Sequence, residues 1–261
     1  MPALARFSIL LVLFSVLALP LRAAEAPAAP AEKAAVGHSQ EAPSAIVVGF
    51  VGGFVRHDNP YHGPVILSKR LQDDTLKGAF VRVYENRHRR NAFETILHLL
   101  DRNHDGKLSD EEKAQARIVL FGHSWGGSAV VLLARDLQRV GIPVLLTVQV
   151  DSVAKPWQKD SIVPENVAAA VNFYQPHGII KGRPQIVAAD PSKTQILGNY
   201  RYDYRKEPVQ CENLSWYDRF ITPGHARSEC DPHLWTRVED LVKQALAPAT
   251  GVVASAPLPQ P

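Results

Sequence analysis

The stretch "GHSWGG" (122–127) contains the residue best suited to chemistry, Ser124, at the centre of a G-x-S-x-G pattern. The apolar run "RIVLF" (117–121) precedes it and a helical pattern over 126–141 follows it. Flanking glycines allow a sharp turn between strand and helix. Backbone N–H groups and the helix dipole at such a turn favour developing negative charge. We therefore predict that Ser124 is a nucleophile, and the alternative is a glycine turn without activity.

A serine hydroxyl is a weak nucleophile at neutral pH and needs a base that a third group orients. Asp151 directly follows the apolar run "PVLLTVQV" (143–150). The carboxyl end of a parallel strand is where catalytic groups gather. Asp190, in "QIVAADPSK", is the alternative acid, but its strand is less well defined.

The segment "VLFGHSWGGSAV" resembles the nucleophile elbow of the α/β-hydrolase family, in particular its esterases and lipases. The resemblance extends from Ile46 to the last predicted helix. It implies the chain order serine, acid, histidine, and a base in a loop shortly before the final helix, which is the position of His225. His233 is then expected on the helix surface, and His123 as a buried packing residue.

The resemblance also implies two backbone N–H donors that stabilise an oxyanion. One is Trp125, the residue after the nucleophile. The other comes from the loop 51–60 after the first strand, where Gly53 and Phe54 are both candidates.

The stretch "DRNHDGKLSDEE" (101–112) has oxygen-bearing residues at the spacing of a calcium-binding EF-hand loop, with a glycine at its sharp turn. The predicted ligands are Asp101, Asn103, Asp105, Lys107 through its backbone carbonyl, Ser109 and Glu112.

A capping box between Ser109 and Glu112 is the alternative, but it does not explain the D-x-N-x-D-G before it. The sequence has no second loop of this type to pair with. We therefore expect a structural calcium ion that braces the segment before Ser124, and regulation by calcium is the less favoured reading.

Strand-like apolar runs alternate with helical stripes along the chain, which predicts an α/β fold with a mostly parallel central sheet flanked by helices. The predicted strands are 45–51, 79–85, 117–121, 143–150 and 168–175, and the predicted helices are 63–74, 91–101, 126–141 and 231–246. The segment between Asp151 and the strand 168–175 leaves little room for a large lid.

The N-terminus has the pattern of a secretory signal peptide over 1–26, with one arginine, an apolar run and an A-x-A ending. A membrane anchor is the alternative, although the run is shorter than the ~20 residues that a spanning helix needs. An Ala/Pro-rich linker (27–45), a hydrolase domain (46–246) and a disordered tail (247–261) are expected to follow.

The two cysteines, Cys211 and Cys230, are expected to form a disulfide if the protein is exported, and two free thiols are the alternative. Such a bridge would hold the loop that carries His225. A formal net charge of +3 is too small to indicate a nucleic-acid partner.

The sequence thus predicts an exported serine hydrolase that cleaves a small-molecule or lipid carboxylic ester, or a thioester, through an acyl-Ser124 intermediate. We expect a structural Ca²⁺, no organic cofactor and no stable membrane span after signal removal. Two alternatives remain: a non-catalytic calcium-stabilised binding protein on this scaffold, and an acyltransferase or peptidase that uses the same triad.

Overall fold

The computed structural model describes residues 43–74, 76, 78–211 and 222–248 of the chain. The predicted signal peptide (1–26) and most of the predicted linker and tail lie outside these residues. Within the linker range, Ser44 already bonds to the carbonyl of Gly78, and Ala45 is buried. None of the helices in the described part of the chain is both long and apolar enough to cross a membrane.

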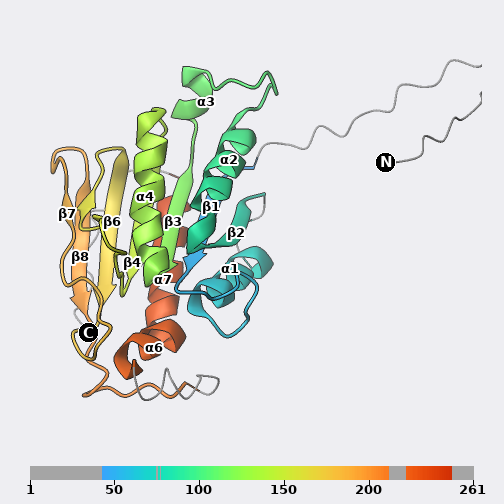
Figure 1. Ribbon diagram of the computed structural model, residues 1–261. Helices are drawn as coiled ribbons and strands as arrows, with labels where there is room; N and C mark the ends of the chain where they lie inside the picture. Colours follow the sequence, from blue (N-terminus) through green and yellow to red (C-terminus); the bar gives the residue numbers. More distant parts are fainter. Residues whose placement is uncertain (1–42, 75, 77, 212–221, 249–261) are drawn as a thin grey trace, which may run out of the picture. The chain divides into compact units, whose positions relative to one another are not determined.

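A six-stranded sheet in the order β2-β1-β3-β4-β6-β8 forms the centre of the fold, and all of its strand pairs are parallel (Figure 1). Its strands are β1 (Ile46–Val51), β2 (Phe80–Glu85), β3 (Ile118–His123), β4 (Val144–Val150), β6 (Val167–Tyr174) and β8 (Gln195–Arg201). A separate two-stranded sheet pairs β5 (Ile162–Val163) with β7 (Val187–Ala188). The central strands β1 and β3 are buried along their whole length, as their continuous apolar sequences require.

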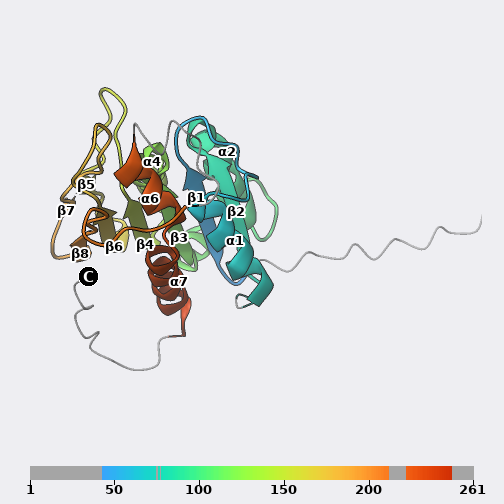
Figure 2. The ribbon, with the colours of Figure 1, turned by 90° about the horizontal axis from the view of Figure 1, so that it is seen from below.

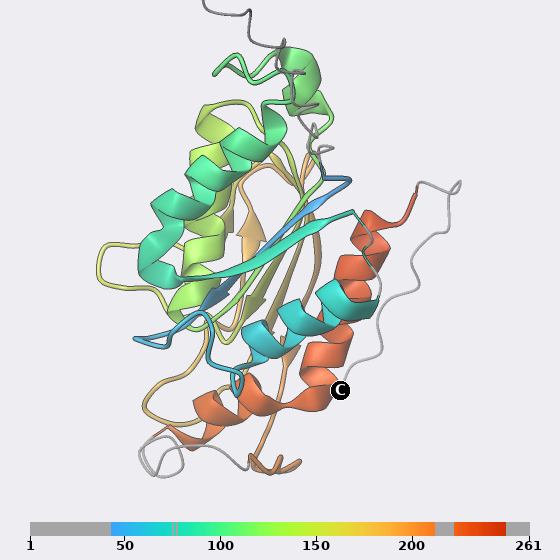
Figure 3. The same ribbon diagram turned by 90° about the vertical axis from the view of Figure 1, so that its right-hand side faces the viewer.

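Helices cover both faces of this sheet (Figures 2 and 3). The helices are α1 (Gly63–Asp74), α2 (Arg89–Leu100) after the short 3₁₀ helix η1 (Asn86–His88), α3 (Asp110–Ala114), α4 (Trp125–Arg139), α6 (Pro223–Cys230) and α7 (Pro232–Leu246). Alternate residues of each strand point to opposite faces. Val48 and Leu120 therefore pack with α2 and α4, whereas Val47 and Val119 pack with α1 and α7. The predicted compact fold of the α/β-hydrolase type is confirmed.

Several elements were not predicted, among them the edge strand β8 and helix α6. Strand β8 has mostly half-exposed residues, and Gly198, at a bulge against β6, interrupts its pattern. Helix α6 begins within Thr222-Pro223-Gly224, a sequence typical of a turn, with Thr222 as its N-cap and Pro223 at the first helical position, where proline is favoured.

The order of the strands determines where a site can form. From β1 the chain crosses to β2 on one side, and β3 then pairs on the other side of β1. In sheets of this kind ligands usually bind outside the carboxyl ends of the strands where the direction changes, which here are β1 and β3.

Candidate active site

Ser124 occupies the turn between β3 and α4 with a backbone φ of 58° and ψ of −125°. A positive φ is costly for a residue with a side chain and is held only by tight surrounding structure. Here the turn is packed against β1, because a Cβ on Gly126 would lie 2.3 Å from the carbonyl oxygen of Phe50. The G-x-S-x-G pattern therefore has a steric cause.

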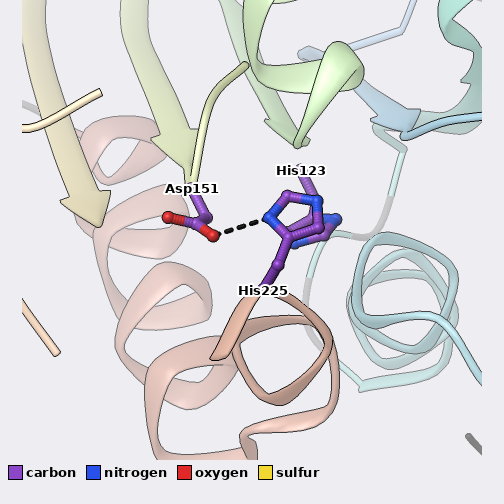
Figure 4. A group of neighbouring side chains, drawn as sticks. All are labelled: His123, Asp151 and His225. Carbon is purple, nitrogen blue, oxygen red and sulfur yellow. Dashed lines mark hydrogen bonds and ion pairs between the residues drawn. The ribbon is translucent and has the colours of Figure 1, made fainter. Parts of the chain in front are cut away.

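The structure brings the three predicted triad residues, Ser124, Asp151 and His225, into one hydrogen-bonded chain. Nε2 of His225 lies 2.9 Å from Oγ of Ser124, and Nδ1 lies 2.6 Å from Oδ2 of Asp151. Ser124 comes from the turn after β3. Asp151 follows the end of β4, and His225 comes from α6 (Figure 4). The arrangement can remove a proton from Ser124 while a carboxylate stabilises the resulting imidazolium.

Asp151 is fully buried, and its carboxylate is surrounded by donors. Oδ1 accepts from the backbone N–H groups of Gln175 at 3.0 Å and Gly182 at 2.7 Å, and Oδ2 also accepts from the Gln175 side chain at 3.1 Å. A Cβ on Gly182 would lie 2.0 Å from Oδ1, so only glycine fits there. These bonds leave Oδ2 directed at His225, and sequence reasoning did not find the residues that make them.

The predicted loop position of His225 is wrong, because the residue lies in the first turn of α6. Gly224 allows this turn to approach the site, since a Cβ there would lie 2.4 Å from the side-chain oxygen of Gln175. A base fixed on a helix has less freedom than one on a loop.

The alternative residues lie elsewhere or have other partners. Asp190 accepts hydrogen bonds from Ser192 within its own turn. His233 is exposed in the first turn of α7, as predicted.

The predicted oxyanion donors lie beside the nucleophile. Trp125 is the first residue of α4, where N–H groups have no intrahelical partner. The loop after β1 approaches so closely that a Cβ on Gly52 would lie 2.7 Å from Cβ of Ser124. The exposed ring of Phe54 packs edge-to-face on Trp125.

Two residues that the sequence did not reveal tie these donors together. The Asn86 side chain donates to the carbonyl of Gly53 at 2.6 Å, so the N–H of Phe54 on the same trans peptide faces away from Asn86. Lys155 donates to Asn86 at 2.7 Å, and its ammonium lies 4.8 Å from the centre of the Trp125 ring.

His123 is buried as predicted, but its ring faces a carboxylate instead of serving only as a packing residue. Its Nδ1 lies 2.5 Å from Glu229, and Glu229 also pairs with His62 at 2.9 Å. Burial alone would lower the pKa of His123, but the contact with Glu229 together with the charge of Asp151 outweighs burial and raises this pKa above 6.5. Burial alone would raise the pKa of Glu229, but the two histidines lower it well below 4.5.

Ligand atoms of His123, Asp151 and His225 lie within 4.8 Å of one another, which is close enough for a metal ion. All four imidazole nitrogens, however, already contact a partner: Ser124 and Asp151 for His225, Ser228 and Glu229 for His123. Hydrogen bonds and the close contact with Glu229 therefore already account for every ring nitrogen of this cluster.

The predicted calcium loop joins α2 to α3, and Leu108 packs against the core, as the EF-hand pattern requires. Gly106 has a φ of 78° and donates to Asp101 at 3.0 Å, and Lys107 N–H donates to the Asp105 side chain at 2.8 Å. These turns leave further lone pairs on each carboxylate oxygen, so the donor set fits a cation.

The predicted alternative, a capping box of Ser109 and Glu112, is also present. Glu112 accepts from the N–H groups of Ser109 and Arg102, and these bonds lower its pKa. The helix that leaves the loop, α3, is only five residues long.

No protein-family model matches this sequence, and no curated protein is similar to it. Solved structures that resemble the chain include an arylesterase (11% identity, 78% of this chain and 77% of that one, TM-score 0.44). The RedJ thioesterase of Streptomyces coelicolor shares 12% identity over 85% of this chain and 96% of that one, with a TM-score of 0.43. Human thioesterase 2 shares 10% identity over 78% and 96%, with a TM-score of 0.40. Because these sequence identities and TM-scores are low, the activity of this chain has to be inferred from its own residues.

Proposed function

We propose that this protein is a serine hydrolase that cleaves carboxylic esters or thioesters through an acyl-Ser124 intermediate. The observation that carries the proposal is the chain of hydrogen bonds from Ser124 through His225 to Asp151. The alternative, a glycine turn without activity, does not explain why a strained serine, a histidine on a helix and a buried carboxylate form one hydrogen-bonded chain.

The reaction follows from these contacts. Oγ of Ser124 attacks the carbonyl carbon of the ester while Nε2 of His225 takes the hydroxyl proton. Asp151 keeps the proton on Nδ1 and stabilises the imidazolium. The N–H groups of Trp125 and of Gly53 or Phe54 bind the oxyanion. His225 then protonates the leaving alcohol or thiol, which departs and leaves the acyl group on Ser124. In the second half of the reaction His225 takes a proton from water, the water oxygen attacks the acyl carbon, and the proton returns to Ser124 as the acid leaves.

Exposed apolar side chains in the loops near the triad support a substrate ester with an apolar part. Four large apolar side chains that are more than half exposed lie in the loops after β1, β4 and β6, at the edge of the sheet that carries Ser124. They are Phe54 (83% exposed), Tyr61 (57%), Trp157 (98%) and Ile179 (81%). A small-molecule or lipid ester would cover part of this surface, because burial of apolar area is favourable.

The decisive experiment treats the protein with a fluorophosphonate, which reacts with activated serines, and locates the adduct by peptide mass spectrometry. We expect one adduct on Ser124 and none in Ser124→Ala. An unlabelled, folded wild-type protein would contradict the proposal and favour a binding protein. Product analysis with competing alcohols and peptides then separates hydrolysis from acyl transfer and peptide cleavage.

We further propose that a structural Ca²⁺ binds the loop 101–112 and that the protein is exported. Asp101, Asn103, Asp105, the carbonyl of Lys107, Ser109 and Glu112 would hold the ion, which would supply local rigidity. The disulfide between Cys211 and Cys230 supports an oxidising compartment. N-terminal sequencing of the mature protein tests export, since a first residue near 27 is expected.

A further inference from the structure

A second carboxylate–histidine pair lies directly behind the triad. Glu229 and His225 are on the same helix, α6, and His123 is the last residue of β3, next to Ser124. The rings of His123 and His225 lie 4.6 Å apart with planes tilted by 34° (Figure 4). The pair therefore touches both the base and the strand that carries the nucleophile.

Ser228 connects this pair to His225. Its hydroxyl donates to the backbone carbonyl of His225 at 2.7 Å, and the same Oγ lies 3.0 Å from Nε2 of His123. A hydroxyl has one proton and a carbonyl can only accept. The Ser228 proton is used on the carbonyl, so Nε2 of His123 has to donate to Oγ.

The other nitrogen of His123, Nδ1, lies 2.5 Å from the Glu229 carboxylate, at an angle that does not make a regular hydrogen bond. Because a carboxylate oxygen can only accept, so close a contact is favourable only if Nδ1 carries a proton. Counting protons in this way makes His123 doubly protonated. The raised pKa of His123 and the lowered pKa of Glu229 agree with this count. The other titratable groups that face the pair are His62 at Glu229, and Asp151 and His225 beside His123.

We propose that Glu229 holds His123 as a buried imidazolium and that this cation, acting through Ser228, positions His225 for proton transfer. The inference rests on the proposed serine-hydrolase function. His123, Ser228 and Glu229 are positioning residues, because none of them contacts Ser124 Oγ or the carboxylate of Asp151 by a hydrogen bond in the described part of the chain. If His123 lost its charge, Nε2 would accept the Ser228 proton, and the bond to the His225 carbonyl would break.

A double-mutant cycle with Glu229→Gln and Ser228→Ala tests this route. We expect each single variant to lower kcat for p-nitrophenyl acetate about 10- to 100-fold, because small displacements of a catalytic group have effects of this size. KM should change less than about twofold. The double variant should be no slower than the slower single variant, since both changes remove the same bond. Losses that multiply, or an unchanged kcat in folded Glu229→Gln, would overturn the proposal.

Glu239→Gln is the matched control. Glu239 on α7 is also a mostly buried carboxylate with two cationic partners, Arg70 and Lys243, and none of the three contacts the triad. This variant should lose stability without losing kcat. An equal loss of kcat in Glu239→Gln would mean that any weakened ion pair has this effect.

Imidazole ¹H–¹⁵N NMR measures the protonation of His123 without any substrate. At pH 7 both ring nitrogens of His123 should carry protons in the wild-type protein, and one proton should be lost in Glu229→Gln. A neutral His123 in the wild type would refute the imidazolium even if the enzyme were fully active. A charged His123 in a protein that fluorophosphonate does not label would instead refute the proposed function alone.

Discussion

Asn86 and Lys155 show how single side chains far from the nucleophile in sequence prepare its surroundings. Asn86 fixes the peptide after Gly53, and Lys155 lies between Asn86 and the Trp125 ring. An oxyanion donor acts only if it is already aimed at the place where charge develops. The orientation of this peptide therefore depends on one amide side chain.

Replacing Asn86 by alanine should lower kcat about 10- to 100-fold, because it frees the peptide whose N–H is a candidate donor. Steady-state hydrolysis of p-nitrophenyl acetate measures the effect. Asn86 donates to the carbonyls of Val51 and Gly53. Asn166→Ala is the matched control, since Asn166, just before β6, likewise donates to two backbone carbonyls, those of Ala134 and Ile142. If both variants lose kcat equally, Asn86 acts through general stability and not through the oxyanion site.

The residues that sequence reasoning missed have one cause in common. Ser124 and Asp151 were predictable because each follows a mostly apolar, buried strand, and this pattern is local. Glu229 and Asn86 act through contacts with residues distant in the chain, and no short pattern encodes such a contact. In the sequence, a glutamate on a short helix and an asparagine after a strand are typical of surface positions. Only the folded structure shows that these two side chains lie at the site.

At the scale of elements, α6 was not predicted although it carries the base of the site. Its eight residues include the base His225, the positioning residues Ser228 and Glu229, and Cys230. The long apolar elements 63–74, 143–150 and 231–246 were predicted almost to the residue, because burial of one face dictates their period. Helix α6 buries mainly polar side chains, so its sequence lacks that period.

The disulfide between Cys211 and Cys230 anchors the end of α6. Its removal in Cys211→Ser/Cys230→Ser should cost about 3 kcal/mol in free energy of unfolding, given a loop of 19 residues. We expect kcat at 25 °C to fall about tenfold or more while the protein stays folded, because α6 carries His225. Denaturant titration and ester hydrolysis measure the two effects. Full activity in the folded double variant would show that packing alone holds α6.

At the scale of the whole described domain, the sheet separates two sites. The triad lies at the carboxyl ends of β3 and β4. The loop 101–112 precedes β3 and therefore lies towards the amino ends of the strands (Figure 1). Strand β3 has six residues and spans about 20 Å. An ion in the loop is therefore too far from Ser124 to act on the substrate, and its effect on catalysis has to pass through the stability of β3.

Calcium should therefore raise stability with little change in kcat. At a free concentration of 100 times Kd, binding adds about 2.7 kcal/mol, so chelation should lower Tm by about 5–10 °C for a domain of this size. Asp101→Asn should abolish this dependence, because it removes a ligand charge while its side-chain oxygen can still accept from Gly106. Asp110→Asn is the control, since Asp110 is an exposed acid in the same segment at a position that supplies no ligand. Scanning calorimetry with and without chelator reads the outcome directly. Equal calcium responses in both variants would mean that the ion binds elsewhere. A loss of kcat on chelation, at a temperature where the protein stays folded, would mean that calcium regulates the active site from the opposite end of the strands.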